Sequence, residues 1–507
     1  MEVLQQGHPQ SILWEVSLMN NLPKRWMMTT LGEICSKPQY GWTCIAEKIG
    51  NVKYLRTSDI SEGTIGWDSV PCCREIPSDI EKYRVHRDDI LVARAGSVGI
   101  SYRITDVPYD AVFASYLIRF NALEGVEARY IEHYLKSDNY WRSISEFTAG
   151  IAVPNVNASK LASLEIPLPP LSEQRRIVTK LEKLLGKVDA CQKRLEKIPV
   201  IIKRFRQAVL TVACSGRLTT DWREKNPNVK PASEVLGRIL KDRDKIKRKV
   251  KKVSETDNLD VPFDIPSTWA LCVFDDLAAA RPNAIKAGPF GSSLTKSCYV
   301  PKGFKVYGQE QVINGDPNFG GYYISEEKFN ELRSCEVSTG DILVSLVGTI
   351  GKVLVIPKQF QPGIINPRLA KFSLHSSIVR GYITNYLLSP IVKNILLQQS
   401  HGGTMKILNL GIMRALPITL PPLPEQHEIV RRVEALFALA DQIEARYKKV
   451  KAYADKLTQS ILAKAFRGEL VPQNPNDEPA SELLKRLRTV QNISKKNFIN
   501  KMCKRKK

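Results

Sequence analysis

The chain contains a long internal repeat, in which residues 89–218 realign with residues 341–470 at a constant shift of 252 residues. Asp-Ile-Leu-Val at 89–92 recurs at 341–344, and Pro-Pro-Leu-Ser-Glu-Gln at 169–174 recurs as Pro-Pro-Leu-Pro-Glu-Gln at 421–426. A unit of about 250 residues is far longer than the ~20 to 50 residues of a solenoid repeat. The repeat therefore predicts a duplicated set of domains related by pseudo-two-fold symmetry.

The two copies cover nearly the whole chain. Leu-Pro-Lys-Arg-Trp at 22–26 matches Ile-Pro-Ser-Thr-Trp at 265–269, which leaves residues 1–21 as an N-terminal extension. After Leu218 the shift falls to 248, where Pro-Ala-Ser-Glu at 231–234 meets the same letters at 479–482. The first copy therefore holds four additional residues near 220–223.

Composition and cysteine spacing favour a cytoplasmic protein. The 507 residues are 43% hydrophobic, enough for several cores. The ten cysteines form no Cys-x-x-Cys pair and the six histidines form no paired metal motif, so we expect reduced thiols and no metal. No run of about 18 apolar residues occurs, so we expect no membrane association.

The formal net charge of +23 is concentrated in two stretches. Residues 238–252 contain nine basic and two acidic residues, and residues 485–507 contain ten basic and no acidic residues. Both stretches follow the Pro-Ala-Ser-Glu element. The positions favour a polyanionic partner; a solvated linker and a solubilising tail are the alternative.

Each copy ends in a heptad pattern typical of a coiled-coil helix. Pro-Pro-Leu precedes the pattern, and Gly216 or Gly468 follows it, as suits helix boundaries. Pro199 interrupts only the first pattern and predicts a kink there. We expect the two helices to pair as an antiparallel coiled coil, in preference to an exposed oligomer seam. The positions assigned to helix pairing or subunit docking are Leu181, Leu184, Val188, Leu195 and Phe205 in the first copy, and Val433, Leu436, Ile443, Val450 and Leu457 in the second.

Two globular segments, 22–170 and 261–422, precede the helical regions 171–260 and 423–507. Each reads as short strands and turns with one or two helices, so the predicted class is mixed α/β. We call these segments head 1 and head 2.

With two such heads, each followed by a long helix, the chain resembles the specificity subunit of type I restriction-modification systems. The resemblance rests on the two Pro-Pro-Leu-x-Glu-Gln elements with their long helices, on residues 198–210, and on Ala-Lys-Ala-Phe-Arg-Gly-Glu-Leu-Val-Pro at 463–472. It covers about residues 22–490 and is weakest in the heads.

The resemblance implies a non-catalytic subunit that reads double-stranded DNA. Each head would be a target recognition domain for one half of a bipartite, asymmetric site, and the helices would set the spacing. The helices would also dock two methyltransferase subunits, through which restriction subunits join. S-adenosylmethionine, ATP and Mg²⁺ would belong to those partners, and no cofactor to this chain.

The motif content agrees with a non-catalytic role. No Gly-x-x-x-x-Gly-Lys-Ser/Thr loop and no Asn/Asp-Pro-Pro-Tyr/Phe motif occurs in the sequence. Two rival classes stay open: a self-contained restriction enzyme with a divergent nuclease site, and a coiled-coil adaptor that binds DNA without sequence preference.

Polar residues beside matched glycines are the candidate DNA contacts, because arginine, glutamine and hydroxyl side chains fit base edges. Each one could instead be an ordinary turn residue, and Trp42 could be core. Lys53 and Lys305 occupy matched places and are expected to contact phosphate. The candidates are Tyr40, Trp42, Thr43, Lys53, Tyr54, Arg56, Thr57, Ser58, Arg94 and Ser97 in head 1, and Ser292, Ser293, Lys296, Lys305, Tyr307, Gln309, Gln311, Ser345 and Thr349 in head 2.

Overall fold

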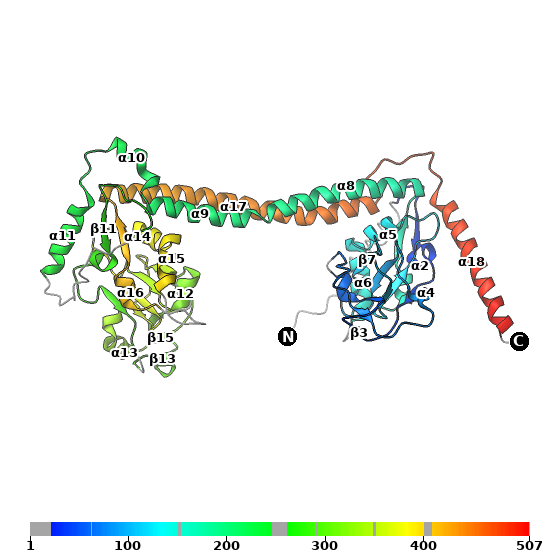
Figure 1. The fold of residues 1–507 in the computed structure, drawn as a ribbon, viewed down its shortest axis with the longest axis horizontal. Helices are drawn as coiled ribbons and strands as arrows, with labels where there is room; N and C mark the ends of the chain where they lie inside the picture. The colour runs from blue at the N-terminus through cyan, green and yellow to red at the C-terminus, as the bar shows by residue number, and fades with distance from the viewer. Residues whose placement is uncertain are drawn as a thin grey trace. The chain divides into compact units, whose positions relative to one another are not determined.

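The computed structural model describes residues 22–61, 63–150, 154–245, 261–290, 293–347, 351–399 and 408–505, with side chains up to residue 492 (Figure 1). The chain divides into two compact units. Unit 1 joins Met1–Glu196 to Lys448–Lys507, and unit 2 is the continuous stretch Lys197–Tyr447. Each unit is described by itself.

Unit 1 contains head 1, which is built on two four-stranded sheets. One sheet has the order β2 (Gln39–Tyr40), β9 (Leu117–Phe120), β6 (Ile90–Ala93), β7 (Ser101–Arg103). The other has the order β3 (Ala46–Glu47), β5 (Cys72–Cys73), β4 (Lys53–Leu55), β8 (Ala111–Phe113). A separate antiparallel pair joins β1 (Met27–Thr30) to β10 (Glu165–Leu168). The short helices are α2 (Leu31–Ile34), α3 (Thr57–Ile60), α4 (Ile80–Tyr83), α5 (Ala128–Tyr134), α6 (Asp138–Thr148) and α7 (Ala158–Ala162).

Unit 2 contains head 2, which repeats the same strand orders at matched positions. The first sheet is β12 (Ile285–Ala287), β19 (Leu369–Phe372), β16 (Ile342–Ser345), β17 (Val353–Val355), and the second is β13 (Tyr299–Val300), β15 (Tyr323–Ile324), β14 (Phe304–Tyr307), β18 (Gly363–Ile365). β11 (Ala270–Val273) pairs with β20 (Pro417–Leu420). The helices are α12 (Gln309–Asn314), α13 (Glu326–Glu331), α14 (Arg380–Leu387), α15 (Pro390–Gln399) and α16 (Leu410–Arg414). The predicted mixed α/β class and duplication are confirmed.

The repeated Asp-Ile-Leu-Val motif forms the central strand of each head. Every residue of β6 is buried, and alternate side chains enter two different cores, because successive side chains of a strand point to opposite faces. Ile90 and Val92 join the core that contains α5, whereas Leu91 and Ala93 join the core between the two sheets. β16 is buried in the same way. A strand covered on both faces explains the continuous apolar run.

Three helices carry the heptad pattern: α8 (Leu171–Leu195), α9 (Ile198–Cys214) and α17 (Leu423–Phe466). The predicted interruption at Pro199 is confirmed, since α8 ends before it and the proline occupies the first turn of α9. Pairing is antiparallel in each unit. In unit 2 Arg206 contacts Glu444, and Thr219 just beyond α9 contacts Glu425. In unit 1 Gln192 contacts Asp455.

Only one of the two apolar rows of the heptad pattern is well buried. Leu181, Val188 and Val433 are buried, and Leu184, Leu195 and Leu436 are half-buried. Phe205, Ile443, Val450 and Leu457 are 36–47% exposed and do not belong to the buried face of the helix pair, so their role in pairing or subunit docking stays a prediction. The small Ala440 and Ala454 take the buried row of α17 instead. The paired face is therefore narrower than a full coiled-coil seam, and an apolar row is left at the surface.

The Pro-Ala-Ser-Glu elements begin helices α11 (Ala232–Asp244) and α18 (Ala480–Arg505). Each helix start is tied to the segment before the first strand of a head: the amide of Ala232 donates to Thr268 O at 2.9 Å, and that of Ala480 to Arg25 O at 3.0 Å. Thus α18, at the end of the second sequence copy, is bonded to head 1, and α11, at the end of the first copy, is bonded to head 2. No helix among the described residues is both long and apolar enough to cross a membrane.

Candidate nucleic-acid interface

The Glu-Gln pair of the repeated motif anchors each head to its long helix. Gln174 accepts a hydrogen bond from the Glu127 amide at 2.9 Å and donates to Pro169 O at 2.9 Å. Gln426 makes the same two bonds, with the Val379 amide and with Pro421 O. Both glutamines are fully buried. The motif therefore fixes where each helix starts relative to its head.

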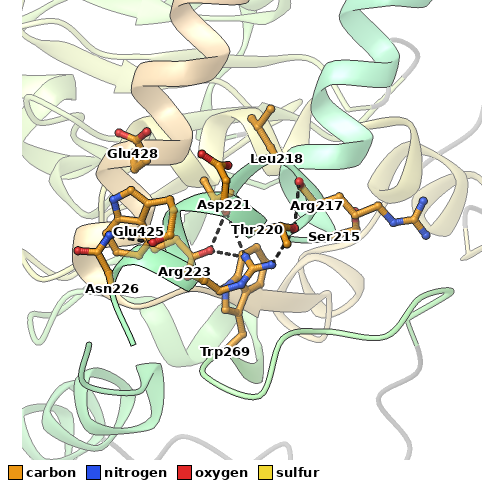
Figure 2. A network of polar contacts seen from close by, with 12 residues as sticks. Ser215, Arg217, Leu218, Thr220, Asp221, Arg223, Asn226, Trp269, Glu425 and Glu428 are labelled. Atoms are coloured by element: carbon orange, nitrogen blue, oxygen red, sulfur yellow. Dashed lines mark hydrogen bonds and ion pairs between the residues drawn. The ribbon is translucent and has the colours of Figure 1, made fainter. Parts of the chain in front are cut away.

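The neighbouring glutamates have different partners in the two units. The Glu425 side chain is 0% exposed. Its carboxylate accepts from Arg223 at 2.6 Å, from Thr219 at 2.7 Å and from the Trp269 indole at 2.9 Å (Figure 2). Arg223 lies on α10 (Thr220–Lys225), the element that contains the predicted four-residue insertion. A buried carboxylate needs such charge and hydrogen-bond compensation.

In unit 1 the matched carboxylate has a neutral partner. Glu173 is buried and accepts a hydrogen bond from Gln473 at 2.6 Å. Burial raises the pKa of Glu173. The two heads are thus anchored at equivalent places through different chemistry.

One surface of each head combines a common backbone frame with different side chains. The amide of Arg94, which follows β6, donates to Tyr116 O at 2.9 Å, and the amide of Leu346, which follows β16, donates to Arg368 O at 2.9 Å. Two further pairs of backbone bonds match at the same shift. The amide of Val156 donates to Arg94 O in head 1, as that of Leu408 donates to Leu346 O in head 2. The amide of Leu117 donates to Ala114 O, as that of Leu369 donates to Asn366 O. We call this surface the tip of each head.

Two matched glycines complete this frame. Gly41 donates to Leu117 O and Gly288 donates to Leu369 O. A Cβ at either glycine would clash with the carbonyl oxygen of residue 114 or 366, respectively, so glycine is required for the close approach.

The tip of head 1 carries an aromatic and basic cluster. The Arg94 guanidinium lies 5.0 Å from the ring centroid of Tyr40, and its Nη2 is 3.4 Å from Asn155 Oδ1. The Tyr40 hydroxyl accepts from the Ala158 amide at 2.9 Å. Tyr116, whose carbonyl oxygen accepts from the Arg94 amide, is 61% exposed. Cationic and aromatic groups at one surface suit contact with nucleic acid.

The tip of head 2 places its cation elsewhere. Leu346, at the position of Arg94, is buried, whereas Arg368, at the position of Tyr116, is exposed. Arg368 Nη1 is 3.3 Å from Gln309 Oε1, and Gln309 Nε2 is 3.0 Å from Ser345 Oγ. Phe290, two residues after Gly288, is 78% exposed. The framework is common to both heads and the chemistry at its surface differs.

The structure brings several predicted contact residues to the tips. Tyr40, Arg94 and the exposed Thr43 and Ser97 lie at or near the tip of head 1, and Gln309 lies at the tip of head 2. Arg56 is the N-cap residue of α3, which matches α12, and its guanidinium is held by Asp59 at 2.8 and 3.0 Å. Thr57 and Ser58 follow on α3. Ser293 is half-buried, and Lys296 is exposed before β13.

Five predicted contacts are contradicted by their burial. Tyr54, Lys305, Tyr307, Gln311 and Ser345 are 0–6% exposed, and a buried side chain cannot reach a base edge or a phosphate. Tyr54 donates to Trp42 O, Tyr307 to Gln361 O and Gln311 to Phe319 O, while Lys305 lies 3.3 Å from Gly320 O. Their polar atoms stabilise the heads.

Two half-buried residues have internal partners as well. Lys53 donates to Val70 O at 2.8 Å, and the Trp42 indole donates to Glu75 O at 2.9 Å. Trp42 thus follows the core alternative. Ser292 and Thr349 lie outside the described residues. Tyr116 and Arg368 are not among the residues predicted from single loops, although the shift of 252 residues aligns the two positions.

Comparison with known proteins gives the family. The family model for the type I restriction modification DNA specificity domain matches residues 23–200 and 291–452. The type I restriction enzyme EcoBI specificity subunit from Escherichia coli is 31% identical over 430 residues, covering 84% of this chain and 82% of that subunit. The EcoKI specificity subunit from Escherichia coli strain K12 is 29% identical and covers 79% of this chain and 78% of its own length.

Solved structures share the fold. The HsdS subunit from Thermoanaerobacter tengcongensis has a TM-score of 0.54 and 20% identity, covering 88% of this chain and 98% of that chain. A chain from a type I R-M system, solved in work on complex assembly and conformational transition, has a TM-score of 0.59 and 20% identity, covering 88% of this chain and 99% of that chain. The repeated heads, the antiparallel helices and these matches together show that the chain belongs to the family of type I restriction-modification DNA specificity subunits.

Proposed function

We propose that this chain selects the DNA sequence on which a type I restriction-modification complex acts. Each head reads one half of a bipartite site in double-stranded DNA, and the long helices set the spacing between the halves. The observation that carries the proposal is the pair of tips, where one backbone frame holds Tyr40, Arg94 and Tyr116 in head 1 but Ala287, Leu346 and Arg368 in head 2. Different side chains on equal frames predict an asymmetric site.

The recognition experiment uses this chain assembled with the methyltransferase subunits of its own system. Sequencing of methylated adenines, in cells with and without the chain, should reveal one split motif with a methylated adenine in each half. Both adenines should lose methylation together when the chain is absent. A motif that is continuous, or identical in both halves, would contradict recognition by two different heads.

The exposed apolar row supports a docking role for the long helices. Ile443 and Leu457 of α17 are 43% and 47% exposed, and an apolar row on a charged helix favours a protein partner. We assign this row to two methyltransferase subunits, which carry S-adenosylmethionine and through which restriction subunits bind with ATP and Mg²⁺. The chain itself holds no cofactor and no active site in this scheme.

The docking assignment is tested by replacing Ile443 and Leu457 with asparagine. The free energy of unfolding should change by no more than about 1 kcal/mol, because surface substitutions rarely exceed ~0.5 kcal/mol each. The affinity for methyltransferase subunits, measured by titration, should fall at least about tenfold, since interface anchors commonly contribute more than 1 kcal/mol. Lys456→Gln, an exposed neighbour of Leu457, is the matched control. Undiminished assembly of the double variant would remove the assignment.

The two alternative classes make different predictions. A self-contained restriction enzyme would cut or methylate DNA as the purified chain alone. An adaptor without sequence preference would bind its partners and would bind random and specific duplexes equally. The different tips favour the specificity role over both.

A further inference from the structure

The tip of head 2 orients one exposed arginine through a chain of side-chain hydrogen bonds. Gln309 donates from Nε2 to Ser345 Oγ at 3.0 Å and also to Val347 O. Because these acceptors fix the amide, its Oε1 faces Arg368 Nη1 at 3.3 Å. The Arg368 amide donates to Asn366 Oδ1 at 3.0 Å, which holds the turn beneath the side chain. The buried Ser345 therefore positions an exposed guanidinium through a single glutamine.

The remaining donors of this guanidinium are available to a ligand. Among the described residues no carboxylate forms an ion pair with Arg368, whereas Arg333 of the same head pairs with Glu336 at 3.7 Å. Arginine has five N–H donors in a planar fork, and Gln309 occupies one of them. A guanidinium that is oriented by Gln309 and keeps its other N–H donors free of the described residues can donate two parallel hydrogen bonds to two acceptor atoms that lie in one plane.

The matched position of head 1 carries a different group. Tyr116 stands where Arg368 stands, and it is 61% exposed. The arginine of head 1, Arg94, directly follows the neighbouring strand β6 and packs on Tyr40. Position 116/368 is therefore the place where equal backbone frames present unlike exposed side chains.

We propose that Arg368, oriented by Gln309, reads a guanine in the half-site bound by head 2, through the O6 and N7 atoms in the major groove. The inference rests on the proposed function and assigns its first specificity-determining residue. Gln309 is a positioning residue that acts through Arg368. The tyrosine at the matched place in head 1 gives the other half-site a different base preference at the corresponding position.

The test measures base preference position by position. The full chain, assembled with its methyltransferase subunits, is bound to duplexes randomised across both half-sites, and the bound DNA is sequenced. Arg368→Ala should reduce the preference for one G·C pair in one half-site by about 10- to 100-fold, the discrimination of a good bidentate contact. The other half-site should keep its preferences.

Three further variants separate a base contact from other roles. Arg368→Lys keeps the charge but loses the fork, so it should lose the guanine preference while the total affinity for DNA stays nearly unchanged. Gln309→Ala should weaken the same preference without affecting other positions. Arg333→Ala, an exposed arginine elsewhere in head 2, should leave the motif unchanged.

Several outcomes would overturn the assignment. Equal weakening on every sequence with Arg368→Ala would show a phosphate contact. A full guanine preference with Arg368→Lys would show that the planar guanidinium oriented by Gln309 does not determine the base, which contradicts the proposed geometry. An unchanged motif with Arg368→Ala, or a preference lost at a base other than guanine, would also remove it. If the wild-type complex selects no split motif, the proposed function itself fails, and that result is distinct from all the others.

Discussion

The buried imidazole of His133 makes the stability of unit 1 depend on pH. His133 on α5 is 7% exposed, and its Nδ1 has no hydrogen-bond partner among the residues that the structure describes. Burial lowers the pKa of His133 from 6.5 to about 4. The folded protein therefore keeps this imidazole neutral under conditions in which the unfolded chain protonates it.

Unit 1 should lose stability on mild acidification because of His133. The unfolded chain takes up a proton below about pH 6.5 and the folded chain only near pH 4, so stability falls as the pH drops through that window. Between pH 7 and pH 5 the loss should be about 2 kcal/mol in the wild type. Chemical denaturation at both pH values measures it, and His133→Gln should remove that part of the loss.

The exposed His86 of the same unit supplies the control for that measurement. His86→Gln should keep the pH dependence of the wild type. An equal loss of stability in the wild type and in His133→Gln would show that other groups cause it.

At the residue scale the sequence predicted the site only in part. Tyr40, Arg94 and Gln309 were predicted because polar residues lie next to matched glycines, and the structure brings them to the tips, whereas their contact with DNA stays a prediction. Tyr54, Lys305 and Tyr307 lie in strands, where alternation decides between exposure and burial. Short strands covered on both faces show no alternation, so the sequence could not separate their buried polar residues from exposed ones.

At the scale of elements, the four-residue insertion of the first copy supplies the counter-ion of a buried carboxylate in unit 2. It lies within α10, which brings Arg223 to the buried carboxylate of Glu425 (Figure 2). The same helix brings Asp221 to Arg432 at 2.6 and 2.9 Å. Unit 1 lacks the insertion and uses Gln473 at the equivalent carboxylate. The break in the repeat is thus the source of the ionic anchor of head 2.

Arg223→Ala should destabilise unit 2 by about 3 to 5 kcal/mol, because it leaves a buried carboxylate without its counter-ion. Thermal or chemical unfolding followed by hydrogen exchange at α17 measures the effect. Arg217→Ala removes an exposed arginine from the adjacent turn and should change stability by less than about 0.5 kcal/mol. Equal effects of the two substitutions would contradict the role of the Glu425 contact.

The long helices were predictable in their position and in their antiparallel pairing, but not in their packing. The heptad pattern gave helix boundaries close to those observed, because Pro-Pro-Leu and glycine mark both ends. It assigned both apolar rows to the pair, although Ile443 and Leu457 are exposed. A heptad pattern reports that a row is apolar and does not say which partner covers it.

At the scale of the whole molecule, the basic C-terminal residues should strengthen binding to DNA of any sequence. Removal of residues 493–507, which include seven lysines and arginines and no acidic residue, should lower the affinity for specific and scrambled duplexes alike. The dependence of affinity on salt between 50 and 200 mM should become less steep. Binding isotherms of the assembled complex measure both quantities. An unchanged salt dependence would favour the solubilising role.

The two compact units do not coincide with the two sequence copies, so the segments of unit 1 are translated at different times. Unit 2 is one continuous stretch, whereas unit 1 needs Lys448–Lys507 to cover head 1. The core of head 1 includes Phe466 and Leu483, which contribute to it from beyond unit 2 in the sequence. At the usual ~5 to 20 residues per second, the ribosome needs roughly 15 to 60 seconds to translate residues 197–507. The domain that is translated first is therefore completed last, and it waits on the ribosome with part of its apolar surface uncovered.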